Sequence, residues 1–440
     1  MRYYLGVLVA VLLLGVPWFA MTFPNEMLSG LSAISIAEDQ FAAVVLSHNP
    51  KSIADIQSRY NTQQGISSEK KVRILIVPGH EPGYGGAEYG SVKERDLNVE
   101  LGQDLEHLLQ ANSHYQVFIT RDAQSWSPVF ADYFKNNWSD IIAWVKGHEQ
   151  EMSHLISVGS IKPAAPTVIH NKAPMDVAYR LYGITKWANE DDIDIVIHIH
   201  FNDNPGHRAA TPGDYSGFAI YVPEGLYNNS TTTKAVAVSV FKRLAKYNPV
   251  SDLPGESTGI VEEPDLIAIG ADNTSDAASM LIEYGYIYEP QLNNPELRGL
   301  VLKDMAFQTY LGLQDFFDTK SVVNGAVSYD TLLIPHEWKN VITKNNTASA
   351  DVYALQTALV IDGVYPPSNK SMNDCPRTGS LGPCTVTALG SFQKEYGITD
   401  EKGIVGPKTI SVLNGRFGLG GALLLPPWHL TKVFLYHLVP

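Results

Sequence analysis

The chain has few cysteines, no excess of positive charge and, after its first 25 residues, no apolar run long enough to span a bilayer. Lysine and arginine number 32 against 46 aspartates and glutamates, which gives a formal net charge of -14. Because binding to nucleic-acid phosphates needs a basic face, this balance argues against a nucleic-acid partner. The two cysteines, Cys375 and Cys384, fit an oxidising compartment and predict one disulfide, the alternative being two buried thiols.

The amino terminus holds the longest uncharged segment. Residues 1–25 contain one arginine, Arg2, and the next charge is Glu26. An apolar stretch after a basic start is typical of a secretory signal, and about 20 uncharged residues are also enough to span a bilayer. The segment has no convincing small-residue cleavage site, which favours a retained anchor over a cleaved signal. Both alternatives predict an exported protein of the cell envelope, in the periplasm or the cell wall.

Short β-branched segments alternate with helical patterns between residues 71 and 320. The run VRILIV at 72–77 leads into a glycine-rich turn and then into leucines at helical spacing. Four further segments read as strands: YQVFITRD, DIDIVIHIHFND, GFAIYVPEG and ASMLIEYGY. This alternation predicts a three-layer α/β domain with a mostly parallel twisted sheet flanked by helices. Residues 26–70 are predicted to be a linker with one weak helical stretch near 52–60.

Potential metal ligands fall at the ends of predicted strands. His80 follows the first strand, His200 is near the end of a later one, and Glu94 begins the helix after the glycine-rich turn. Catalytic zinc takes three ligands of this kind and one water, and strand ends of a parallel sheet meet at one edge. The three residues therefore predict a zinc site, although Glu94 could instead only favour a helix N-terminus. His198 shares a strand face with His200, and spacing does not decide which histidine binds the metal.

From residue 72 to residue 288 the sequence resembles the zinc-dependent N-acetylmuramoyl-L-alanine amidases, which cut bacterial peptidoglycan. The resemblance rests on PGH after the first strand and on VKERDLN, VFITRD, IHFN and MLIEYGY. It implies that His80, Glu94 and His200 bind Zn²⁺ and that Glu283 is the catalytic acid/base. It also implies hydrolysis of the amide between the lactyl group of N-acetylmuramic acid and the L-alanine of the stem peptide.

Two features depart from the family pattern. His198 stands where the family usually has a small residue, often serine. An insert at about 123–178 makes the connection after TRD about 70 residues long, more than a compact domain usually has. It contains a predicted helix, and we interpret it either as a lid or cleft wall or as a peripheral decoration. His148 and His154 in the insert do not form an HExxH motif, because the second histidine would have to be at residue 152.

Residues 349–418 are predicted to form a second, all-α domain of three short helices. The motifs ALQTAL, TGSLGPCTVTALGSFQ and GIVGPKT resemble the peptidoglycan-binding module found beside wall hydrolases. The resemblance implies that the module holds the enzyme on its substrate, the alternative being a small bundle that only packs on the catalytic domain. Residues 320–348 are a connector. The tail at 419–440 is apolar but interrupted by prolines, so we expect it to pack rather than to span a membrane.

Two other functions remain compatible with these patterns. One is a different zinc peptidase that acts on the stem peptide, and the other is a non-catalytic cell-wall-binding protein. The survival of all four candidate site residues, the three ligands and Glu283, favours an enzyme. Peptidoglycan is the expected partner in each case, and the sequence leaves the oligomeric state open.

Overall fold

The computed structural model describes six ranges of the chain: residues 49–61, 71–170, 172–208, 210–317, 330–344 and 348–419. The predicted signal or anchor at 1–25 lies outside these ranges, and so does the tail after residue 419. Within them, no helix is both long enough and apolar enough to cross a bilayer.

A six-stranded sheet forms the centre of the larger domain, with strand order β4-β1-β5-β8-β6-β7. In that order the strands are β4 (Tyr115–Ile119), β1 (Val72–Pro78), β5 (Ile195–Asn202), β8 (Ala278–Tyr286), β6 (Ala219–Pro223) and β7 (Ile260–Glu263). The first four run parallel, whereas β6 is antiparallel to β8 and parallel to β7. The prediction of a mostly parallel sheet is confirmed. The short strand β7 was missed, because its four residues, IVEE, show no clear apolar pattern.

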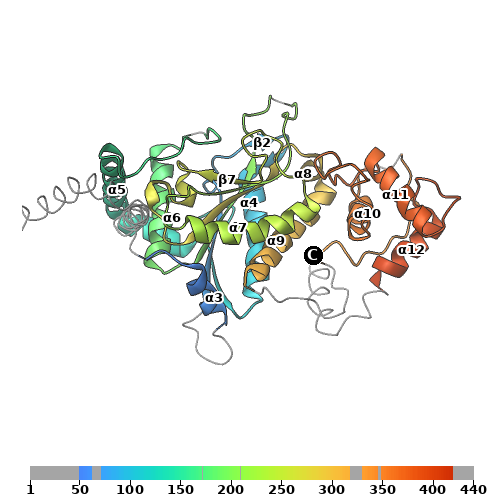
Figure 1. Ribbon diagram of the computed structural model, residues 1–440, viewed down its shortest axis with the longest axis horizontal. Helices are drawn as coiled ribbons and strands as arrows, with labels where there is room; N and C mark the ends of the chain where they lie inside the picture. The colour runs from blue at the N-terminus through green and yellow to red at the C-terminus, as the bar shows by residue number, and fades with distance from the viewer. Residues whose placement is uncertain are drawn as a thin grey trace, which may run out of the picture.

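Helices cover both faces of the sheet, as the predicted three-layer domain requires (Figure 1). Successive strand residues point to opposite faces, so Ile74 and Ile76 of β1 enter one core while Leu75 and Val77 enter the other. The first core is covered by α4 (Glu94–Gln110), α7 (Ser230–Tyr247) and α9 (Pro295–Phe317). The second is covered by α5 (Pro128–Ser157) and α6 (Met175–Glu190). Smaller elements are the β2 (Glu88–Tyr89) and β3 (Val92–Lys93) hairpin, α8 (Pro290–Asn293), η2 (Ile267–Ile269) and η3 (Ala271–Asn273).

The predicted linker contains a helix that packs on the sheet domain. Helix α3 (Ile53–Asn61) covers the weak helical stretch seen in the sequence. Ile56 is fully buried in the first core, and the amide of Gln57 donates to the carbonyl of Phe316 at 3.0 Å. The ring of Tyr60 stacks on Phe317 with a centroid distance of 4.3 Å. Residues 53–61 therefore contribute to the folded domain.

The helix predicted in the insert is α5, and it forms part of the second core. Phe130, Ile141 and Val145 of α5 pack with Leu75 and Val196 of the sheet. The amphipathic pattern of the segment therefore buries one side of a long helix against the strands.

The smaller domain contains the three predicted helices, α10 (Ala350–Ile361), α11 (Pro383–Glu395) and α12 (Pro407–Phe417). Proline stands in the first turn of α11 and of α12, where the missing N–H is not needed. The predicted disulfide between Cys375 and Cys384 is present. The core of this domain begins upstream of residue 349, because Ile334, Trp338 and Ile342 of the predicted connector are buried in it.

Arg377 of the smaller domain is buried against the larger one. Its Nε donates to the carbonyl of Tyr247 at 2.7 Å, and its Nη2 lies 3.5 Å from a carboxylate oxygen of Asp304 in α9. Its Nη1 donates to the hydroxyl of Thr357 in α10 at 2.6 Å. A buried guanidinium is costly unless it is paired and hydrogen-bonded, so these contacts favour one orientation of the two domains.

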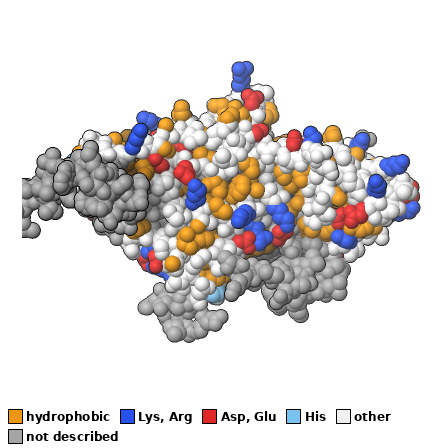
Figure 2. Space-filling model, in the orientation of Figure 1, with side chains coloured by type: hydrophobic (Ala, Val, Ile, Leu, Met, Phe, Trp, Pro, Cys, Tyr) orange, Lys and Arg blue, Asp and Glu red, His pale blue; other side chains and the backbone are white. Residues whose placement is uncertain are grey.

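The molecular surface has charges of both signs. On the face drawn in Figure 2, lysine and arginine side chains are scattered among acidic ones.

One carboxylate on α4 is expected to destabilise the fold at neutral pH. Burial raises the pKa of Asp104 to about 6; Lys303 opposes this shift and Glu100 adds to it. The Oδ2 atom of Asp104 is buried and has no hydrogen-bond partner in the described part of the chain. The charged form is therefore disfavoured in the folded state relative to the unfolded state.

We expect the substitution Asp104→Asn to stabilise the protein by about 1–2 kcal/mol at pH 7.5, with part of the full pKa effect lost to solvent screening. The gain should shrink as the pH falls through about 6 and vanish near the ordinary aspartate value of 3.8, where both states are protonated. Urea denaturation of the two proteins at several pH values measures this difference. Equal free energies of unfolding for Asp104→Asn and the unchanged protein at pH 7.5 would show that the Asp104 carboxylate does not destabilise the fold.

Candidate active site

The loop after β1 places His80 beside β5. The backbone N–H of Gly79 donates to the carbonyl of Ile199 at 2.9 Å, which holds the end of β1 against β5. His80 has a φ angle of 68°, a left-handed conformation that residues with a side chain rarely adopt. Strained backbone of this kind persists where the surrounding structure enforces it and is frequent at functional sites.

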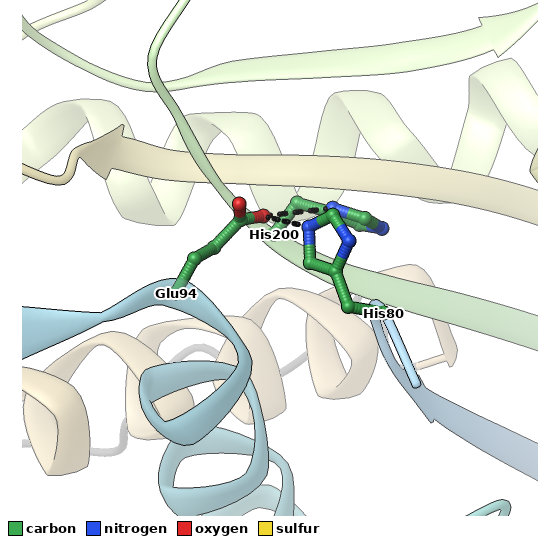
Figure 3. A group of neighbouring side chains, drawn as sticks. All are labelled: His80, Glu94 and His200. Atoms are coloured by element: carbon green, nitrogen blue, oxygen red, sulfur yellow. Dashed lines mark hydrogen bonds and ion pairs between the residues drawn. The ribbon is translucent and has the colours of Figure 1, made fainter. Parts of the chain in front are cut away.

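Glu94, the first residue of α4, faces two imidazoles with one carboxylate oxygen (Figure 3). Its Oε1 lies 2.8 Å from Nε2 of His80 and 3.0 Å from Nδ1 of His200. Its Oε2 accepts the backbone N–H of Ala87 at 2.9 Å. The side chain is therefore held in one orientation, and Glu94 is only 5% exposed.

The ligand atoms of His80, Glu94 and His200 all lie within 4.8 Å of one another. Within the described residues, this is the one group of histidine, cysteine and acidic side chains that could hold a metal ion. Two imidazole nitrogens and one carboxylate oxygen are a typical ligand set for catalytic zinc, with a further position left for water. The structure thus brings His200 together with His80 and Glu94, which lie more than a hundred positions earlier in the sequence.

Two glycines leave the space that these side chains occupy. A Cβ atom at Gly79 would lie 2.2 Å from Nε2 of His200, and one at Gly86 would lie 2.9 Å from Cδ2 of His80. Gly86 also has a φ angle of 84°. The glycine-rich turn is therefore required both for its backbone conformation and for close approach to the imidazoles.

The electrostatics of the group suit metal binding. Burial alone would raise the pKa of Glu94, but attraction to His80 and the hydrogen bond from His200 outweigh it and hold that pKa below its ordinary value. Burial lowers the pKa of His200, and Glu94 offsets part of this shift. An ionised carboxylate and a neutral imidazole are the forms that bind metal ions.

His198 lies on the same face of β5 but outside this group. It is 1% exposed, and neither ring nitrogen has a hydrogen-bond partner among the described residues. Burial lowers the pKa of His198 to about 3, and His200 adds to the shift. Sequence spacing did not decide which of the two histidines binds the metal. His200 is the one that faces Glu94, because its Nδ1 lies 3.0 Å from Oε1 of Glu94.

Glu283 lies on β8 directly beside His200 in the register of the sheet. Its Oε2 atom is buried and has no hydrogen-bond partner in the parts of the chain that the structure describes. Burial, with repulsion from Glu94 and Glu256, raises the pKa of Glu283 well above its ordinary value. A metal cation nearby would act in the opposite direction and favour the carboxylate.

Glu256 is a second buried carboxylate near the site, and it was not predicted from the sequence. Its Oε1 accepts hydrogen bonds from Nδ2 of Asn202 at 2.8 Å and from the hydroxyl of Tyr221 at 2.5 Å. Its Oε2 accepts from the hydroxyls of Ser251 and Tyr286. Glu256 stands in a loop without strand periodicity. The only signal in the sequence was Asn202, a polar strand residue that needed a buried partner.

Comparison with known sequences identifies two regions. The profile described as N-acetylmuramoyl-L-alanine amidase matches residues 74–296, and a profile for a peptidoglycan binding domain matches residues 348–413. Because the first match spans more than half of the chain, the protein belongs to the N-acetylmuramoyl-L-alanine amidase family. The comparison with curated proteins found no match.

Solved amidase structures show a more distant likeness. The CwlD amidase from Clostridioides difficile, in complex with the GerS lipoprotein, is 16% identical, with 57% of this chain and 100% of that chain covered and a TM-score of 0.37. Ami1 from Mycobacterium smegmatis is 15% identical, with 57% of this chain and 98% of that chain covered and a TM-score of 0.37. AmiC2 of Nostoc punctiforme is 16% identical, with 56% of this chain and 96% of that chain covered and a TM-score of 0.33. These values are too low to transfer the role of any residue.

The close approach of Gly79 to His200 can be tested by adding one methyl group. We expect Gly79→Ala to displace the His200 ring and to weaken Zn²⁺ binding about 10- to 100-fold, as loss of a supporting contact does at metal sites. Gly83→Ala is the control for loop conformation, because a Cβ at Gly83 meets no atom within 4 Å but the φ of +72° disfavours alanine there. Titration calorimetry with Zn²⁺ compares the variants. Equal weakening in both would mean that loop conformation, and not the contact with His200, controls binding.

Proposed function

We propose that this protein is a zinc-dependent amidase that hydrolyses the bond between the lactyl group of N-acetylmuramic acid and the L-alanine of the stem peptide. The main support is the convergence of His80, Glu94 and His200 in a chain of the N-acetylmuramoyl-L-alanine amidase family. The peptidoglycan binding domain supports the same substrate. Since peptidoglycan lies outside the cytoplasmic membrane, the protein acts in the cell envelope or outside the cell.

The three clustered side chains would hold the zinc ion. Nε2 of His80, Nδ1 of His200 and Oε1 of Glu94 are the atoms that face one another. Their fit to zinc rests on the donor set, two imidazole nitrogens and one carboxylate oxygen whose ligand atoms lie within 4.8 Å of one another. When bound, zinc polarises a carbonyl group and lowers the pKa of a water molecule to about 7.

Glu283 would act as the acid/base. Its free Oε2 atom can accept a proton from the attacking water and then donate it to the nitrogen of the departing L-alanine. In this step the water oxygen bonds to the lactyl carbonyl carbon and the carbon–nitrogen bond breaks. The products are a lactyl carboxylate on the sugar and a stem peptide with a free amino end.

Asn202, Tyr221 and Glu256 would keep the strand ends in place around this chemistry. Glu256 receives hydrogen bonds from the last residue of β5 and from the middle of β6, the strands on either side of β8. Fully satisfied polar networks of this kind make a buried site rigid. Glu256 is thus a positioning residue for the strands that carry His200 and Glu283.

Attachment to the wall would be the role of the smaller domain. A tethered binding domain raises the local concentration of its substrate for the linked catalytic site. The buried contacts of Arg377 with Tyr247 and Asp304 favour a single arrangement of the two domains. The bound glycan strand would therefore meet the catalytic site in a restricted set of orientations.

Product analysis tests the amidase assignment. Digestion of purified peptidoglycan with the exported portion of the chain should release stem peptides that begin with L-alanine, identified by mass spectrometry. Glu283→Ala should lower the turnover rate by about 10²–10⁴-fold, the contribution typical of general acid–base catalysis, and should still bind one zinc ion.

Other products would contradict the assignment. Cleavage within the stem peptide, with the lactyl amide intact, would indicate a different peptidase. Binding to the wall with no turnover by the zinc-loaded protein would indicate a non-catalytic binding protein.

Metal analysis tests the ligand set. We expect His80→Ala and His200→Ala to lose stoichiometric zinc, because each removes one of three ligands, whereas His198→Ala should weaken binding less. Chelation should abolish turnover, and added Zn²⁺ should restore it. Mass spectrometry measures the zinc content of each variant. If His200→Ala keeps its zinc and His198→Ala loses it, His198 and not His200 is the ligand.

A further inference from the structure

The insert contains a segment that is fastened across the second face of the sheet. We call residues 161–170 the strap. The backbone N–H groups of Thr167 and Val168 donate to Oε1 of Glu263 at 2.8 and 2.9 Å, and that of Ala164 donates to Oε1 of Glu224 at 2.6 Å. Glu263 ends β7 and Glu224 follows β6, and both are buried. Two carboxylates thus hold the backbone of the strap at the ends of two neighbouring strands.

The strap also fits closely against the sheet and its loops. Val168 is buried in an apolar cluster with Ala219, Tyr221 and Leu281. A Cβ atom at Gly255 would lie 2.8 Å from Cγ2 of Val168 and 3.0 Å from the carbonyl oxygen of Thr167. Burial of two carboxylates is costly, so such tight fastening indicates that the position of the strap matters.

The strap ends at His170, beside the catalytic face of the sheet. The His170 ring meets the Tyr221 ring edge-on, with a centroid distance of 5.0 Å. Tyr221 in turn donates to Glu256, which also binds Asn202. Ile169, the neighbour of His170, is 85% exposed, so the strap has one side towards the site and one towards solvent.

His170 carries an unused hydrogen-bonding atom at this place. Its Nε2 is buried and has no hydrogen-bond partner among the described residues. Burial lowers the pKa of His170 to about 4, and His200 adds to the shift. A neutral imidazole can donate or accept one hydrogen bond at each nitrogen, and a buried nitrogen without a partner among the described residues is a group that a bound ligand can satisfy.

The order of the strands places the His170 end of the strap opposite the metal ligands. His80 and His200 come from β1 and β5, on one side of β8. Because β6 and β7 run antiparallel to β8, the strap is fastened at the edge of the sheet where β8 begins, and only its His170 end, on Tyr221, approaches the metal ligands from the other side of β8. Glu283 on β8 lies between them. On the first side, Arg180 of α6 is paired with Glu81 of the loop after β1 at 2.8 Å, which closes that rim. A substrate at Glu283 would therefore have the His170 end of the strap as its second wall.

We propose that the strap forms one wall of the substrate site and that Nε2 of His170 hydrogen-bonds the amide backbone of the muramoyl-peptide substrate. This inference rests on the amidase function proposed above. It assigns the insert to substrate binding and makes His170 a residue that touches the substrate, on the side of Glu283 away from the metal ligands.

The substitution His170→Phe tests this inference in the full chain loaded with zinc. Phenylalanine keeps a ring against Tyr221 but removes the nitrogen. We expect kcat/KM for a soluble N-acetylmuramoyl-peptide to fall about tenfold or more, the effect of one lost hydrogen bond that leaves a buried partner, with zinc content and Tm unchanged. His170→Gln should recover part of the loss, because an amide can make the same hydrogen bond.

The matched control is His154→Phe, which makes the same change at an exposed histidine of α5 in the same insert. It should keep the kinetic constants of the unchanged protein. Wild-type kcat/KM in His170→Phe would overturn the proposal. So would a loss of activity that is accompanied by loss of zinc or by a lower Tm, because His170 would then support the metal site or the fold.

Direct binding separates this inference from the amidase proposal. In the Glu283→Ala background, the Kd for the same N-acetylmuramoyl-peptide should rise about tenfold when His170→Phe is added. If the unchanged protein releases no peptide that begins with L-alanine, the amidase proposal fails. Equal Kd values with and without His170→Phe would overturn the strap inference alone.

Discussion

The site depends on one constraint, the parallel pairing of β1 with β5, which brings the turn after β1 against the end of β5. The hydrogen bond from Gly79 to Ile199 closes that pairing and places His80 beside His200. Glu94 can then face both imidazoles with a single oxygen. A one-residue slip would turn His200 to the opposite face of the sheet, where α4, α7 and α9 pack. The register of two buried strands therefore controls the metal chemistry.

Two further parts of the protein, the strap and the smaller domain, are each held against the sheet domain by hydrogen bonds to buried charged side chains. Glu224 and Glu263 fasten the strap over the second face of the sheet, and Arg377 fastens the smaller domain against α7 and α9. Buried charges contribute little net stability, but removal of one partner is costly, so they favour one arrangement over others. In a wall hydrolase such rigidity would restrict both how the glycan strand lies and how the stem peptide enters.

Much of the fold could be predicted because its signals are local. Alternation of strands and amphipathic helices predicted the three layers, and the motifs within residues 349–418 predicted the three helices of the smaller domain. The strand β7 could not be predicted, because its sequence IVEE has no clear apolar pattern, and the orientation of β6 could not, because it is set by pairing with the distant strand β8. The helix α3 was seen only as a weak pattern, because its stability comes from the contacts of Ile56 and Tyr60 with distant residues.

By itself the sequence determined which residue types are available at the strand ends: His80, Glu94 and His200 with metal-binding side chains, and Glu283 on an apolar strand. Periodicity and motifs carry such information because they depend on neighbours in the chain. Only the tertiary structure decided that His200 and not His198 faces Glu94, that Glu256 joins β5 to β6, and that the insert reaches the same face. These contacts join residues far apart in the sequence, and their geometry is set by the packing of the whole sheet.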